Sequence, residues 1–156
     1  PSPGLARPSA SPGLRADLPY CPGRIAQGYA MTELDRLPQI VSGFSTEGVD
    51  AALKLFERLT DRTIVVDVEE DELAKLFLNS WRYMQFAIAN QFYMIAEERG
   101  LDYFRIHDAM VQGYERADDY PLPGFTAGPC LLKDTMQLSA FEQNRLQLGH
   151  SAILAN

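Results

Sequence analysis

The sequence predicts an α-rich α/β protein in which a strand–helix–strand segment precedes an all-helical part with one long helix. Two short runs rich in β-branched residues, 39–44 and 63–68, lie on either side of a helical pattern. Residues 70–99 contain neither proline nor glycine, which is typical of a long uninterrupted helix. With 156 residues, 46% of them hydrophobic, the chain is long enough to bury a core.

The N-terminal third contains the expected strands. Residues 1–17 open with a run rich in proline, serine and glycine, and we expect them to be irregular. A weak strand is predicted at 18–21, ending at Pro22, and a stronger one at 39–44.

A helix should follow the second strand. Ser45 or Thr46 is its expected N-cap, and apolar residues at helical spacing carry it to about Thr60. The run TIVVDV, residues 63–68, is the clearest strand of the sequence. Strand, helix and strand in this order predict a βαβ fragment.

The C-terminal part should be helical. The long helix is expected over 70–99, ending at Gly100. Its middle, 76–96, is apolar on nearly every face, which predicts burial, often against a partner chain. A second helix is expected over 102–114, a loop over 118–129, and a last helix from Asp134 past Leu148.

Charge and composition exclude several classes of protein. Acidic residues outnumber basic ones 21 to 14, so the net charge is −7 and no basic patch for nucleic acid is visible. No run of 18 apolar residues or signal peptide is apparent, and the start at Pro1 suggests a cut or processed piece. Two cysteines favour a reducing, cytoplasmic setting. His107 and His150 have no partner at metal spacing, so we expect no metal site.

The segment from Gly124 to Thr135 is the best candidate for chemistry. A glycine-rich loop delivers Cys130 a few residues before an expected helix start, where free backbone N–H groups and Lys133 would favour a thiolate. Such a thiolate is a nucleophile. In the alternative, Cys130 is an inert apolar residue and Asp134 is only an N-cap, with Gln137 as its capping-box partner. The residues alone leave both interpretations open.

A second candidate group lies on the long helix. Six polar and aromatic residues at steps of three and four share one face: Lys75, Asn79, Arg82, Phe86, Asn90 and Tyr93. Lys75 and Asn79 are neighbours that could stabilise negative charge on oxygen. Lys75 is equally well explained by a side chain that reaches solvent, whereas a buried Asn79 needs a hydrogen-bond partner.

Other signals are weaker. Arg116 could bind a phosphate or carboxylate, or it could pair with Glu115 or Asp118 on the surface. No GxGxxG motif follows a strand, and no Walker A motif is present. The chain therefore carries no nucleotide fingerprint of its own.

Four motifs in order resemble the UDP-glucose/GDP-mannose dehydrogenase family, most closely its UDP-N-acetylmannosamine dehydrogenase-like branch. They are Tyr20-Cys-Pro-x-Arg24-Ile-x-x-Gly28, Leu37-Pro-Gln-Ile-Val41-x-Gly43, Glu72-Leu-Ala-Lys75-Leu-x-x-Asn79 and Ala127-Gly-Pro-Cys130-Leu-x-Lys133-Asp134-Thr135. The likeness covers about residues 18–150. It implies an NAD-dependent oxidation of a nucleotide sugar, from alcohol through aldehyde to carboxylate.

The resemblance also implies roles for particular residues. Cys130 would attack the aldehyde, and Lys75, Asn79 and Asp134 would hold the sugar, stabilise the oxyanion or manage water. A separate set would bind substrate: Arg116, often across a dimer, Gly124 and Phe125 in a covering loop, and Lys133 beside the nucleophile with a less certain role.

In domain terms, the resemblance makes 18–68 the end of a Rossmann NAD-binding domain and 69–156 the central helical domain for dimerisation and substrate. A third, nucleotide-binding domain would be absent. Two departures stand out. Gly23 occupies a position where the family usually has a glutamate that helps with water activation, and Gln27 one where some members have a second glutamate. An inactive dimerisation module is therefore the alternative function. An unrelated cysteine-dependent acyl-transfer enzyme is a weaker third, because Cys130 lacks a histidine partner.

Overall fold

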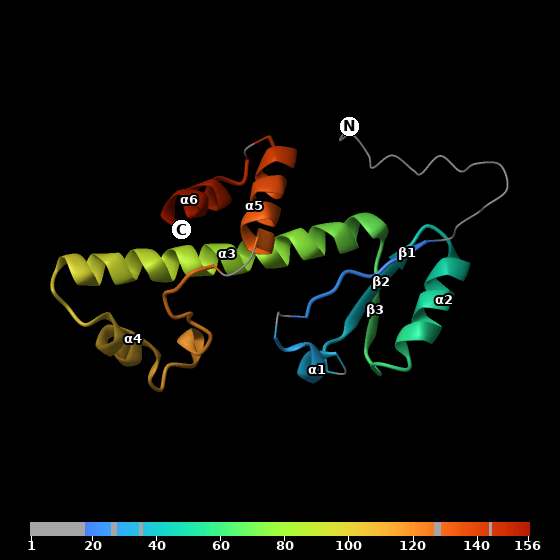
Figure 1. Cartoon of the computed structure of the whole chain (residues 1–156), viewed down its shortest axis with the longest axis horizontal. Coiled ribbons are helices and arrows are strands. Elements are labelled where there is room, and N and C mark those ends of the chain that lie inside the picture. Colours follow the sequence, from blue (N-terminus) through green and yellow to red (C-terminus); the bar gives the residue numbers. More distant parts are fainter. Residues whose placement is uncertain (1–17, 26–27, 35, 127–128, 144) are drawn as a thin grey trace. The chain divides into compact units, whose positions relative to one another are not determined.

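The computed structural model describes residues 18–156 apart from 26–27, 35, 127–128 and 144 (Figure 1). The expectation for residues 1–17 and the departure at Gln27 lie outside the described residues. The described residues form two compact units that divide between Leu73 and Ala74, and each is described by itself.

The first unit is built on a three-stranded sheet in the order β1-β2-β3. Strand β1 (Pro19–Tyr20) is antiparallel to β2 (Gln39–Gly43), and β2 is parallel to β3 (Thr63–Val65). A short helix, α1 (Ala30–Glu33), follows β1, and α2 (Thr46–Phe56) joins the two parallel strands. The strand–helix–strand prediction is therefore confirmed.

Local hydrogen bonds explain where these elements begin and end. Ser45 is the N-cap of α2, since its hydroxyl oxygen accepts from the Gly48 N–H at 3.0 Å. Helix α2 ends at Phe56 and β3 at Val65, both earlier than the sequence pattern suggests. The early end of β3 follows from the next helix, because the Glu70 carboxylate accepts from the Asp67 N–H at 3.0 Å, half of a capping box.

Helix α3 (Val68–Glu98) is the long helix, with 31 residues. Gly100, with a φ of +68°, follows the end of the helix as its C′ residue. The Leu101 N–H donates to the Ala96 carbonyl at 3.0 Å and the Gly100 N–H to the Glu97 carbonyl at 2.9 Å. These two bonds form a Schellman motif, for which glycine is preferred because it has no Cβ.

Two shorter elements follow. Helix α4 (Tyr103–Val111) starts at the N-cap Asp102, whose carboxylate accepts from two backbone N–H groups, and it ends three residues before the expected Tyr114. A 3₁₀ turn, η1 (Glu115–Ala117), leads into the loop.

The prediction of a single last helix from Asp134 past Leu148 is wrong. Helix α5 (Pro129–Phe141) begins five residues earlier, because proline fits the first helical position without losing a hydrogen bond. The chain then breaks, with Gln143 at φ +51°, before α6 (Gln147–Ala155). Gly149 allows α6 to approach α5 closely, because a Cβ there would lie 3.2 Å from Thr135 Cγ2 of α5.

The core of the second unit joins α3, α5 and α6 through a small cluster: Tyr83, Ala87, Leu131 and Ala152. Many large apolar side chains of α3 stay outside it. Phe77 is 55% exposed and Trp81 54% exposed, so this chain by itself does not bury α3 on all sides. None of the helices in the described part of the chain combines the length and apolar character that a bilayer crossing requires.

Candidate active site

The two motifs singled out in the sequence meet through a buried hydrogen bond. Asn79 on α3 and Asp134 on α5 are each 4% exposed. Asn79 Nδ2 donates to Asp134 Oδ2 at 2.5 Å. The amide that needed a partner has one, and that partner comes from a segment 55 residues away in the sequence.

The second oxygen of Asp134 faces a cation. Lys133 Nζ lies 2.6 Å from Asp134 Oδ1, and the lysine side chain is 64% exposed. The carboxylate is thus held by an amide on one side and an ammonium on the other, which compensates its burial. Asp134 is in the second turn of α5, so the alternative in which it is the N-cap of this helix is wrong.

Cys130 lies in the first turn of α5 and its side chain is exposed. It is not in a loop before the helix, as expected, because α5 begins at Pro129. The first-turn position still has free backbone N–H groups and the positive end of the helix dipole. Cys130 and Asp134 are four residues apart on one helix, which places their Cβ atoms about 5–6 Å apart on the same face.

Lys75 and Asn79 are likewise four residues apart on one helix, so their side chains share a face. Lys75 is half-buried and takes part in a further interaction of its own. The Asn79–Asp134 bond therefore joins two helical pairs. One carries an ammonium and an amide, the other a thiol and a carboxylate, and these are groups that acyl transfer through a thiol requires.

The expected substrate-binding residues are placed differently. Gly124 is bonded to Asn90 of α3 in both directions, N–H to Oδ1 at 2.8 Å and Nδ2 to carbonyl at 3.0 Å. Phe125 is 97% exposed. Arg116 lies in η1 with its guanidinium carbon 5.7 Å from the centre of the Tyr114 ring. Among the described residues it forms no ion pair with Glu115 or Asp118, so the surface-pair alternative is wrong.

The structure also shows a buried polar group that the sequence did not reveal. In the first unit, Asp71 and Ser42 are both 0% exposed, and Ser42 Oγ donates to Asp71 Oδ2 at 2.8 Å. Burial raises the pKa of Asp71, while the bond from Ser42 and the charge of Arg24 act in the opposite direction. Burial and the charge of Asp71 raise the pKa of the neighbouring Cys21 thiol.

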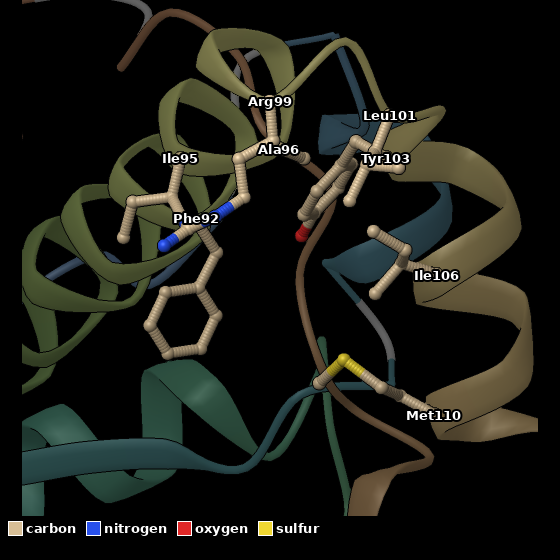
Figure 2. A pocket seen from close by; sticks show the side chains of 8 residues that line it. All are labelled: Phe92, Ile95, Ala96, Arg99, Leu101, Tyr103, Ile106 and Met110. Carbon is tan, nitrogen blue, oxygen red and sulfur yellow. The ribbon is translucent and has the colours of Figure 1, made fainter.

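An open apolar cavity of about 260 Å³ lies elsewhere in the second unit (Figure 2). Its walls come from the end of α3 and from α4: Phe92, Ile95, Arg99, Tyr103, Ile106 and Met110. None of the candidate catalytic residues lines it. Within the described part of the chain, no three acidic, histidine or cysteine side chains gather as a metal site would require.

Comparison with solved structures places this fold among dehydrogenases of nucleotide-linked sugars. A structure from Pyrococcus horikoshii described as a UDP-D-ManNAc dehydrogenase superposes with a TM-score of 0.79 at 25% identity, over 90% of this chain and 34% of that one. A UDP-glucose dehydrogenase from Pyrobaculum islandicum gives a TM-score of 0.74 over 90% of this chain and 34% of that one; at 18% identity it supports the fold alone.

Residues 69–155 match the model of the UDP-glucose/GDP-mannose dehydrogenase family, central domain, and the chain belongs to this family. An NDP-N-acetyl-D-galactosaminuronic acid dehydrogenase from Ralstonia nicotianae is 32% identical over 88 residues, 56% of this chain and 21% of the relative. A UDP-N-acetyl-D-mannosamine dehydrogenase from Yersinia pestis is 26% identical over 144 residues, 90% of this chain and 33% of the relative. The chain thus spans between a fifth and a third of these relatives, and the predicted family is confirmed.

Proposed function

We propose that this chain supplies the end of the NAD-binding domain (18–68) and the central helical domain (69–156) of a nucleotide-sugar 6-dehydrogenase. The observation that carries the proposal is the buried bond between Asn79 and Asp134. It brings the lysine–asparagine and cysteine–aspartate motifs into one site, as a reaction through a bound thioester would need. The names of the relatives support a nucleotide sugar as substrate. We place the reaction in the cytoplasm, the reducing setting that two cysteines favour.

In the proposed chemistry, the sugar 6-hydroxyl is first oxidised to an aldehyde, with loss of a hydride and a proton. The Cys130 sulfur then adds to the aldehyde carbon, and the oxygen that results takes up a proton, giving a thiohemiacetal. Loss of a second hydride and of that proton leaves a thioester. Water cleaves the carbon–sulfur bond, which releases the carboxylate and restores the thiol.

Neighbouring residues would stabilise the oxygen atom that becomes negatively charged in these steps. Asn79 and Lys75 are the donors that could stabilise it, which in enzymes contributes about 10²–10³ in rate for a single donor. Asp134 orients the Asn79 amide through their bond and takes its own charge compensation from Lys133. We place Asp134 as the acceptor for the water that cleaves the thioester.

NAD, when bound, would accept the two hydrides. Within the described residues, no glycine-rich loop leads from a strand into a helix, as a phosphate-binding site for NAD would need: β2 leads into α2 through residues 44–45, and β3 into α3 through residues 66–67. We therefore assign no residue of this chain to the cofactor and expect the isolated chain to be inactive.

The exposed residues of the loop would meet the nucleotide sugar. Phe125, almost fully exposed, would cover the substrate beside Gly124, and the Arg116 guanidinium would bind a phosphate or carboxylate oxygen. Lys133 is long enough to release Asp134 and reach the same substrate.

Gly23 supports the alternative of an inactive module, since members of the family usually carry a glutamate for water activation at this position. A Cβ added to Gly23 would meet no atom within 4 Å, so the variant Gly23→Glu can be built without a clash. In an active enzyme, restoring the glutamate should speed thioester hydrolysis by about 10²-fold or more, as general-base help does. An unchanged steady-state rate would contradict a role for this position in hydrolysis.

Turnover provides the main test. The full-length dehydrogenase containing this chain should form two NADH for each UDP-N-acetylmannosamine, or for another UDP-sugar of a small panel. Cys130→Ser should abolish carboxylate formation while the nucleotide sugar still binds, and the matched control Cys21→Ser should leave both intact. Carboxylate formation by Cys130→Ser would refute the nucleophile, and binding without any NADH formation by the unaltered enzyme would favour the inactive module.

We also propose that α3 pairs with a second copy of this chain. Five large side chains at steps of three, four and seven leave a continuous apolar stripe on one face: Phe77, Trp81, Ile88, Phe92 and Ile95, each 45–55% exposed. Trp81→Glu should convert the dimer to a monomer in sedimentation experiments. The control Phe44→Glu changes an even more exposed aromatic residue away from α3, at 70% exposed, and should not. A monomeric unaltered chain would contradict this pairing.

A further inference from the structure

The loop that leads to Cys130 is held to α3 by one side chain. Asn90 Oδ1 accepts from the Gly124 N–H at 2.8 Å, and Asn90 Nδ2 donates to the Gly124 carbonyl at 3.0 Å. A side-chain amide that bonds both polar groups of one residue replaces the backbone pairing that a loop otherwise lacks. These are the bonds that fix this point of the loop.

The Asn90 amide is itself held in place. Its Nδ2 also donates to Asn156 Oδ1 at 2.9 Å, and Asn156 Nδ2 donates to the Tyr83 carbonyl of α3 at 3.1 Å. The amide orientation follows from these partners, because only an oxygen can accept from Gly124 N–H. A network with each member bonded limits the rotamers of Asn90 more than a single bond does.

Asn90 and Asn79 are related by the geometry of α3. They are eleven residues apart, close to three full turns or about 16 Å along the axis, so they lie on one face. Asn79 holds Asp134 after Cys130 in the sequence, and Asn90 holds Gly124 before it. Two amides on one helix thus fix both ends of the segment 124–134.

We propose that Asn90 is a positioning residue for the Cys130 site. By holding Gly124, it sets where Phe125 and the entry to the cysteine segment lie along α3. Its kinetic consequence rests on the function proposed above, whereas its effect on the loop does not. Asn90 touches no reacting atom and acts through Gly124.

The first test measures the loop alone, by hydrogen exchange of the Gly124 amide in the 156-residue chain. Asn90→Ala should lower the protection of this amide about tenfold at neutral pH, because both bonds are lost. Asn90→Asp should lower it less, because its carboxylate still accepts from the Gly124 N–H while it repels the Gly124 carbonyl. Gln91→Ala is the matched control, since it removes an exposed amide from the next position of α3 and should change nothing.

The aspartate variant separates loss of the bonds from loss of the fold. A neutral carboxyl group has the shape of an amide and can both donate to the Gly124 carbonyl and accept from its N–H. Protection in Asn90→Asp should therefore return as the pH falls below the pKa of the new carboxyl group. Asn90→Ala should show no such return. Unchanged protection in both variants at neutral pH would overturn the proposal.

The second test uses the full-length dehydrogenase. Asn90→Ala should raise KM for the nucleotide sugar about tenfold and lower kcat much less, with recovery of KM in Asn90→Asp at acidic pH. Lower protection with unchanged KM and kcat would overturn the positioning role. If the unaltered enzyme forms no NADH, the proposed function fails and with it the role in turnover, while the exchange result still decides whether Asn90 holds the loop.

Discussion

Each unit of the molecule contains a cysteine beside a buried aspartate, and the two pairs differ in how the carboxylate is satisfied. Asp134 has an amide on one oxygen and an ammonium on the other. Asp71 has only the Ser42 hydroxyl on one oxygen, and its Oδ1 has no partner among the described residues. The same residue type in similar burial therefore has a polar partner on both carboxylate oxygens in one unit and on only one oxygen in the other.

The thiols of Cys130 and Cys21 also differ in their surroundings. Cys130 is exposed in the first turn of a helix, beside free backbone N–H groups. Cys21 is half-buried next to a negative charge, and both causes raise its pKa. A cysteine–aspartate pair thus does not by itself indicate a nucleophile, because the helix terminus and the exposure of the sulfur decide it.

The largest effect is expected from Asn79→Asp, which places a second carboxylate against Asp134. Loss of a charge-assisted bond together with like-charge repulsion should destabilise the second unit by about 4 kcal/mol at pH 7. Acid should restore part of this, since one of the two carboxyls can then be protonated. Urea unfolding at pH 7 and pH 5 measures both effects, and an unchanged midpoint at pH 7 would show that the bond does not form.

Asp134→Ala should cost about 3 kcal/mol, because the buried Asn79 amide loses its acceptor. Asp134→Asn is the matched variant. It keeps an oxygen for Asn79 and loses only the pairing with the largely exposed Lys133, so we expect a loss of about 1 kcal/mol or less. Equal losses in the two variants would mean that the lysine, and not the asparagine, stabilises this carboxylate.

Removing the charge of Asp71 should stabilise the chain, whereas replacing Asp134 should destabilise it. The raised pKa of Asp71 means that the folded state binds its proton more tightly than the unfolded state, so stability rises as the pH falls from the raised value towards the ordinary 3.8. Asp71→Asn keeps an acceptor for Ser42 and removes the charge. It should stabilise the chain by about 1 kcal/mol at pH 7 and flatten this pH dependence, as followed by thermal unfolding. A loss of stability at pH 7 would show that the charge is compensated.

The smallest effect concerns the thiols. At pH 8 a disulfide reagent should label Cys130 about tenfold faster than Cys21, because thiolate fraction and access set the rate. Single variants, Cys21→Ser and Cys130→Ser, assign the two phases. Asp71→Asn should speed the Cys21 phase alone. A Cys21 phase that ignores this change would mean that burial, and not the charge of Asp71, protects the thiol.

Much of the helical part could be predicted because its signals are local. The run without glycine or proline, and Gly100 at its end, were enough to place α3 to within two residues. Pro129 was misleading, because a proline after glycine is typical of a loop and yet suits the first turn of a helix. The break at Gln143 has no glycine or proline to mark it, so α5 and α6 were expected as one helix.

The candidate site was predictable for a different reason. Regular helical spacing put Lys75 with Asn79, and a buried amide on an apolar helix demands a partner. The pair of Ser42 and Asp71 had no such signal. Asp71 sits within an acidic run that the helix dipole explains, and nothing in the sequence says which member of that run meets a strand 29 residues earlier.

Trp81 makes the exposed stripe of α3 observable by fluorescence. It is the single tryptophan of the chain and is 54% exposed. Its fluorescence therefore reports one face of one helix, without any label. Covering that face with a second copy would shift the emission to shorter wavelength, and a dilution series would convert the shift into a dissociation constant.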